Sequence, residues 1–160
     1  MIALQVEGLR EFTQHLFVRD TFDAFWLSEA DIRTKADLII QGRIDPGFFA
    51  SNDTDAGPAD TSGHSEENGA PAYLTWGEVR HYCYEWIKGP VLPLSFRVLL
   101  RDPERTEDEA YLNIRYERDK ALFITTGYAQ KTFSMDRTDE REWDDEVRTF
   151  LAAHDIGLKE

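Results

Sequence analysis

The chain has 160 residues, of which 41% are hydrophobic and 31% charged, and its 31 acidic and 18 basic residues give a net charge of -13. A chain of this length buries enough surface to build one core without metal or disulfide support, which predicts a single domain over residues 1–160. Its short apolar runs exclude a membrane-spanning helix, and its acidity repels nucleic-acid phosphates and anionic membranes unless a local basic face overcomes it.

Two features of the sequence predict a cytoplasmic location. The first residues lead directly into Glu7, Arg10 and Glu11 and lack the pattern of a signal peptide. The single cysteine, Cys83, excludes an internal disulfide, as expected in a reducing compartment.

The first half of the chain is predicted to contain three strands and one amphipathic helix. Residues 1–7 alternate apolar and polar positions and predict a strand, whereas residues 8–19 change to helical spacing. Residues 25–33 and 38–44 predict two more strands joined by a turn. Residues 51–72 contain five acids, no aromatic residue and no Lys or Arg, which predicts a disordered surface loop within the domain.

The second half begins with a predicted helix over residues 75–88, where Thr75 and Glu78 have the spacing of a capping box. Alternating apolar residues then predict strands at 94–101, at 111–117, from Leu122 onward, and a short strand that ends at Phe133. Helical spacing around Trp143 and Val147 predicts a C-terminal helix.

The order of these elements predicts an α+β fold. Consecutive strands joined by short turns pair in antiparallel fashion, which implies an antiparallel sheet of six to seven strands with helices on one face, plus the C-terminal helix. The helix at 8–19 and its two following strands echo the helix at 75–88 and its two strands. A duplicated β-α-β-β(-β) unit is therefore expected, although the echo is one of element order rather than of residues.

No residue pattern in the sequence identifies a catalytic, cofactor or metal site. The four histidines have no partner at the spacing of metal ligands, and no phosphate-binding glycine loop or nucleophile motif occurs. Cys83 lies on the apolar stripe of its predicted helix, which is typical of a buried structural thiol. The sequence therefore predicts no cofactor and no metal, and it favours a protein that is not an enzyme.

Five residues are candidates for a contact or ligand-binding surface, namely Trp26, Glu29, Asp31, Arg43 and Arg115. An exposed tryptophan at position 26 would favour a contact surface. The four charged residues lie within predicted strands, where an interior ion pair, a ligand-binding face and a solvent-exposed face of the sheet would each explain them. The solvent-exposed face is the default interpretation.

Nearly the whole chain resembles a family of small, uncharacterised bacterial proteins of the type found in Clostridia. The stretches that carry the resemblance are Met1–Leu4, Phe25–Ala30, Ile87–Gly89 with Pro93–Phe96, Leu112–Tyr116, Thr125–Gly127 and Trp143–Asp145. The family is described only as a domain of unknown function, so the resemblance implies no activity and no site residues.

The element order also resembles one domain of a sliding DNA clamp, in which two helices lie side by side on a sheet and present basic residues to DNA. The outward sides of the two helices are expected to carry Glu11, Gln14, His15 and Val18 on the first and His81, Tyr84, Glu85 and Lys88 on the second. Neither set is basic overall, which departs from the clamp pattern.

Three functions follow as hypotheses. The leading one is a non-enzymatic protein-interaction module with a clamp-like fold, whose partner is another protein. The alternative is a small-molecule enzyme whose site is assembled from the strand residues named above. The third and least favoured is a nucleic-acid-associated clamp-like protein; no membrane partner is expected.

Overall fold

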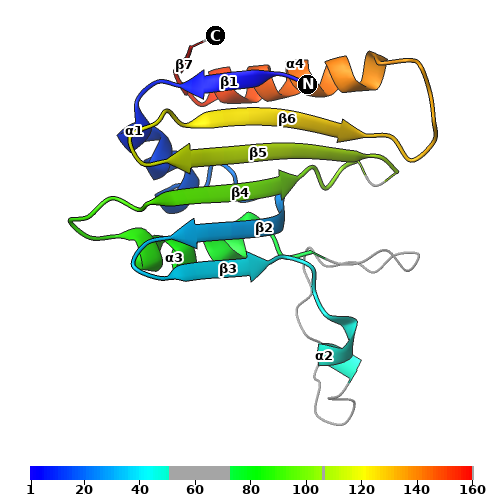
Figure 1. Ribbon diagram of the computed structural model, residues 1–160. Helices are drawn as coiled ribbons and strands as arrows, with labels where there is room; N and C mark the ends of the chain where they lie inside the picture. The colour runs from blue at the N-terminus through cyan, green and yellow to red at the C-terminus, as the bar shows by residue number, and fades with distance from the viewer. Residues whose placement is uncertain (51–72, 106, 160) are drawn as a thin grey trace.

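The frame of the protein is a seven-stranded antiparallel sheet in the computed structural model, which describes residues 1–50, 73–105 and 107–159 (Figure 1). The strands are β1 (Ala3–Val6), β2 (Trp26–Arg33), β3 (Asp37–Gln41), β4 (Ser95–Arg101), β5 (Glu109–Glu117), β6 (Phe123–Ala129) and β7 (Leu158–Lys159). They lie in the order β3-β2-β4-β5-β6-β1-β7, and every neighbouring pair is antiparallel. The predicted α+β class and antiparallel sheet are confirmed. The predicted loop at 51–72 lies outside the described residues.

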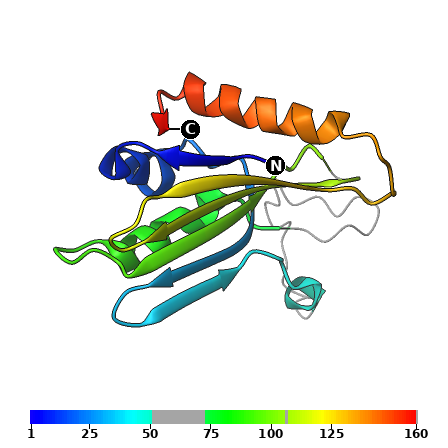
Figure 2. The same cartoon turned by 45° about the horizontal axis from the view of Figure 1, so that its top comes forward.

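Helices cover one face of this sheet. They are α1 (Leu9–Thr13), the π-helix η1 (Gln14–Val18), α2 (Pro46–Ala50), α3 (Trp76–Ile87) and α4 (Thr138–Ala153). Figures 1 and 2 show α1, α3 and α4 behind the sheet, with α4 along the β1 side, whereas α2 lies off one end. The helix predicted at 75–88 is confirmed as α3, and its capping box is formed, because the Thr75 backbone N–H donates to Glu78 Oε2 at 2.9 Å. The C-terminal helix is confirmed as α4.

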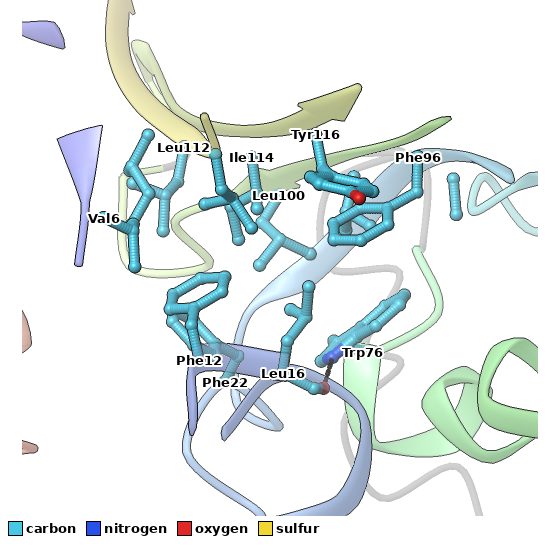
Figure 3. Close-up of a cluster of buried hydrophobic side chains, with 14 of the residues drawn as sticks. Val6, Phe12, Leu16, Phe22, Trp76, Phe96, Leu100, Leu112, Ile114 and Tyr116 are labelled. Atoms are coloured by element: carbon cyan, nitrogen blue, oxygen red, sulfur yellow. Dashed lines mark hydrogen bonds between the residues drawn. The ribbon is translucent and has the colours of Figure 1, made fainter. Parts of the chain in front are cut away.

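The core lies between the helices and the inner face of the sheet (Figure 3). Strand β4 shows why the sequence selects this arrangement, because Phe96, Val98 and Leu100 are buried while the residues between them are not. On the helical side, Trp76 is fully buried and its indole Nε1 donates to the carbonyl oxygen of Leu16 at 2.7 Å. That bond holds the first helical segment against α3.

The first helix differs from the prediction in its second half. After α1 the chain widens into the π-helix η1, in which the Arg19 N–H donates to the carbonyl of Gln14, five residues earlier, at 2.8 Å. The wider turn changes which residues face inward. His15, expected on the outward side, is only 7% exposed, and its Nδ1 lies 2.9 Å from Thr21 Oγ1. The outward prediction for His15 was therefore wrong.

A bulge in β2 decides which of its residues face the core. The pairing of β2 with β4 shifts register between Leu27 and Glu29, so Leu27 and Ala30 are both buried although they lie three residues apart. Beyond the neighbouring strand β3, Gly42 packs so closely on β2 that an added Cβ would lie 1.7 Å from the Leu27 carbonyl oxygen. Only glycine fits there.

Two short segments also differ from the prediction. The strand predicted to end at Phe133 is absent from the described residues; that side chain is 91% exposed and β6 ends at Ala129. The seventh strand is instead β7, which follows α4 and pairs with β1 through Gln5 and Lys159. Neither β7 nor α2 has a periodic pattern long enough to predict it.

Candidate functional site

Four of the five candidate residues lie on the outer face of the sheet, opposite the helices. Trp26, Glu29 and Asp31 come from β2, and Arg115 comes from β5. Arg43 lies beyond the end of β3, exposed, and forms an isolated backbone bridge with Tyr73, whose ring stacks on Trp26. The structure therefore brings the first four onto one face of the sheet, and Arg43 adjoins Trp26 only through Tyr73.

The charged candidates are organised around Arg97 of β4, which sequence reasoning did not single out. In register across the sheet, Arg97 lies between Asp31 and Arg115, and its Nη2 is 3.2 Å from Glu29 Oε1. Arg115 Nη2 lies 3.4 Å from Glu117 Oε1. The hollow between these side chains has a volume of about 180 Å³. It is smaller than the roughly 300–1,000 Å³ typical of small-molecule sites.

Trp26 belongs to a second cluster on the same face, where it is half-buried. Its ring stacks on Tyr73 with a centroid distance of 5.6 Å, and the Arg101 guanidinium lies 4.7 Å from the centre of the Tyr73 ring. Arg101 also lies 3.3 Å from Glu109, which accepts a hydrogen bond of 2.5 Å from the Tyr111 hydroxyl. Burial, reinforced by the Glu109 bond, raises the pKa of Tyr111 to about 12. Within the described residues, these side chains pack against one another and leave no hollow between them for a ligand.

Further polar contacts attach α4 to the rest of the fold. The guanidinium of Arg105 bridges Asp102 at 2.5 Å and Glu146 at 2.6 Å, and it lies 5.2 Å from the Trp143 ring. These two carboxylates raise the pKa of the Arg105 guanidinium, the Glu146 hydrogen bond most. The network joins the β4–β5 connection to the helix and has a structural role.

A different surface, on the helical side, is hollowed and apolar. A groove of about 410 Å³ runs between the α1–η1 segment and the C-terminal half of α3, over the first residues of β4. Its apolar lining includes Leu9, Phe17, Val18, Tyr84, Ile87 and Leu92. Two cations, Arg10 and Lys88, also line it, and no acidic residue among those the structure describes does so. We call this feature the helix groove.

The connection from α3 to β4 extends the helix groove into a second hollow of about 630 Å³. This connection projects at the left of Figure 1 and carries Val91, Leu92 and Leu94, which are 70%, 59% and 51% exposed. Lys35 and Arg118 lie beside them, and the Arg118 guanidinium donates to the Leu92 carbonyl. We call this feature the loop hollow, and the two together the groove surface.

The charge of the groove surface is opposite to that of the chain. Its described residues include four cations and a single acid, Glu85, whose Oε2 lies 2.7 Å from Lys88 Nζ. In the described part of the chain, Arg10, Lys35 and Arg118 form no ion pair. Sequence reasoning missed this surface, although the aliphatic residues that follow the Gly89-Pro90 helix stop were a signal that could have indicated it.

The described residues also bear on metal, membrane and thiol sites. Among these residues, no group of three or more His, Cys, Asp and Glu side chains is placed to hold a metal ion. None of the described helices is long and apolar enough to cross a membrane. Cys83 is fully buried, and burial raises the pKa of its thiol to about 12.

Comparison with known proteins gives one match. A model described as "Family of unknown function (DUF5721)" matches residues 15–110 and 103–159. No curated protein and no solved structure matches the chain. The resemblance to an uncharacterised family is thus confirmed, whereas the resemblance to a sliding clamp stays a prediction.

Proposed function

The chain belongs to DUF5721, a family of unknown function, and for this member we propose the role of a non-enzymatic protein-interaction module that docks its partner on the groove surface. The observation that carries the proposal is the grouping of exposed aliphatic side chains along a hollow. Val91, Leu92 and Leu94 are each more than half exposed and line the loop hollow, and Leu92 also lines the helix groove together with Val18 and Tyr84. Large exposed apolar patches mark interaction sites, whereas single exposed apolar residues are ordinary.

Energetics support a protein partner for such a surface. Complete burial of an aliphatic side chain stabilises an association by about 1.5–3 kcal/mol. Val91, Leu92 and Leu94 are 51–70% exposed, so each would contribute about half to two thirds of that range, which adds to burial of the groove walls against the roughly 4–15 kcal/mol that association costs in lost freedom of motion. The concave shape supports insertion of side chains rather than contact with a flat surface.

The outer face of the sheet supports an enzyme less well. The three arginines that line its hollow each have a carboxylate within 4 Å, because Arg33 lies 3.9 Å from Asp37 and the other two are paired as described above. Ion-paired arginines around a hollow of about 180 Å³ are what a solvent-exposed sheet face would present, although Asp31, which also lines the hollow, has a buried Oδ1 without a hydrogen-bond partner among the described residues.

A clamp-like arrangement remains part of the proposal. The α1–η1 segment contacts α3 directly, since the Phe17 and Trp76 rings are 5.9 Å apart. The first strands after the two helices of the predicted units, β2 and β4, lie side by side, with β3 and β5 flanking them. We favour a bacterial, cytoplasmic protein on the family resemblance and the single cysteine, and a nucleic-acid role less because of the acidic charge.

The test compares partners recovered by groove and control variants. Tagged native chain, the double variant Val91→Glu with Leu92→Glu, and the control double variant Phe133→Glu with Met135→Glu are each incubated with lysate of the source organism. The control residues are 91% and 89% exposed and lie outside the groove surface. Circular dichroism first establishes that all three chains are folded.

The expected result is a partner whose recovery falls about tenfold or more with the groove variant and is unchanged with the control. A photo-crosslinker placed at residue 94 should attach to the same partner. Equal recovery of every protein by the groove and control variants would refute the groove surface as the docking site.

A further inference from the structure

Resting on that proposed function, we infer that the groove surface binds an acidic amphipathic helix of the partner protein. The inference follows from the backbone that borders the helix groove, from the charge of the groove surface, and from the other segments that could compete for it.

The border of the helix groove favours a helix over an extended strand. Its walls are the α1–η1 segment and α3, whose backbone groups bond mostly within their own helices, and the Leu16 and Val18 carbonyls at the end of η1 accept from the side chains of Trp76 and Arg80. An added strand would find few main-chain partners there, whereas a helix satisfies its own backbone hydrogen bonds. A helix in a groove presents apolar residues at positions i, i+3, i+4 and i+7. Such a row matches an apolar floor and walls that continue from Phe17 to Leu92.

The charge of the groove surface favours an acidic helix. Arg10 lies on the α1 side of the groove and Lys88 follows α3 on the opposite side, so cations border it on both sides. Lys35 and Arg118 add two more in the loop hollow. Four cations and one acid gather here in a chain that carries 31 acids and 18 basic residues. Carboxylates on the flanks of a bound helix would meet Arg10, Lys35 and Arg118, which form no ion pair within the described residues, while a basic helix would be repelled.

Large polyanions fit the same surface less well. An anionic bilayer or a nucleic acid extends well beyond the Debye length of about 8 Å at physiological salt, so much of it would face the remaining acidic surface. The phosphates of a nucleic acid would also gain nothing from exposed Val91 and Leu94. A short helix stays within range of the border cations and covers the apolar side chains.

This chain does not supply the occupant from its own described helices. The acidic helix α4 directs its apolar stripe, with Trp143, Val147 and Leu151, into its own core. Residues 51–72 are acidic but contain no aliphatic residue larger than alanine. The occupant is therefore a segment of another protein.

The experiment measures binding of synthetic peptides by calorimetry. The probe is an amphipathic peptide of five helical turns with Leu at the apolar positions and Glu at the others. A second peptide keeps every Leu and replaces Glu by Lys, and a third keeps the acidic composition but scrambles the Leu positions. Only the first should bind the native chain, and added salt should weaken its binding.

Charge reversal supplies the decisive comparison. Arg10→Glu with Lys88→Glu should weaken the acidic peptide by roughly tenfold and make the Lys peptide the tighter ligand. The control, Arg137→Glu with Arg141→Glu, reverses two exposed charges at the start of α4, at the other end of the molecule, and should change nothing (Figure 1). Equal binding of the Glu and Lys peptides, binding insensitive to the reversal, or no binding of the acidic peptide would overturn the inference.

Two further arms separate this inference from its rivals and from the proposed function. The first arm measures binding to vesicles of phosphatidylglycerol and phosphatidylcholine and to duplex DNA. If either binds more tightly than the acidic peptide, and the same charge reversal abolishes that binding, the inference is overturned in favour of that polyanion. If a lysate partner depends on Leu92 but the peptides show no acidic preference, only the helix chemistry is overturned. If no lysate partner depends on the groove surface, the proposed function itself fails.

Discussion

Replacing Trp76 by Phe tests how the two walls of the helix groove are held together. Trp76 is fully buried in α3, and its Nε1 donates to the Leu16 carbonyl at 2.7 Å. Leu16 lies in the last turn of a helical segment, where carbonyl groups lack partners within the helix. The indole therefore supplies a bond that no water can replace in this buried position.

The expected cost of Trp76→Phe follows from two losses. A buried carbonyl left without a donor costs about 1–3 kcal/mol. The smaller phenyl ring leaves a cavity beside Phe17, which adds about 1 kcal/mol. A total of about 2–4 kcal/mol is a large part of the roughly 5–15 kcal/mol by which domains of this kind are stable.

The matched control is Trp86→Phe in the same helix. Trp86 is only partly buried, and its Nε1 donates to the Ala36 carbonyl at 3.3 Å where solvent can reach. Water can replace that bond, so the control should cost less than about 1 kcal/mol. Urea unfolding followed by circular dichroism measures the free energy of unfolding of both variants. The slope of that free energy against urea concentration should be unchanged. Equal costs for the two substitutions would refute the argument.

Three further predictions concern buried polar groups. Burial, aided by Arg19, lowers the pKa of His15 below its ordinary 6.5, so the unfolded chain takes up a proton before the folded one and the free energy of unfolding falls as the pH drops below 6.5. His15→Gln should flatten the profile of unfolding free energy measured from about pH 7.5 to about pH 5.5. An unchanged slope would contradict this. The Cys83 thiol, whose pKa burial raises to about 12, should react with a thiol reagent at about pH 8 only in denaturant, whereas labelling of the native chain faster than it unfolds would show that the thiol is accessible. Thr126 Oγ1 donates to Asp144 at 2.5 Å, so Thr126→Val should cost about 2 kcal/mol in urea unfolding while Thr126→Ser retains most of the stability; equal losses would contradict the hydrogen-bond explanation.

The parts of the fold that sequence predicted well have strong periodic patterns. Strands expected at 94–101 and 111–117 are found at Ser95–Arg101 and Glu109–Glu117, and the helix expected at 75–88 is α3. Each buries one side and exposes the other, so alternation or helical spacing is directly visible in the residues. The two-residue strand β7 shows no such pattern and exists because β1 offers it an edge to pair with.

The candidate sites were predictable only in part. The strand position of Glu29, Asp31 and Arg115 indicated a common sheet face, and the structure places them there. Their pairing with Arg97 depends on the register between β2 and β4, which a bulge displaces. Whether these residues bind anything stays a prediction.

By itself, the sequence determined the elements whose burial pattern is local, namely the central strands and α3 with its cap, and with them the α+β class. Its acidic composition identifies no function. Tertiary structure alone decided three features: the π-helix η1 that buries His15, which residues of β2 face the core, and the groove surface. The physical reason is the distance between the contributing residues. Arg10, Lys35, Lys88 and Arg118 gather around Leu92 only after the sheet and helices pack, and no local pattern records that they will meet.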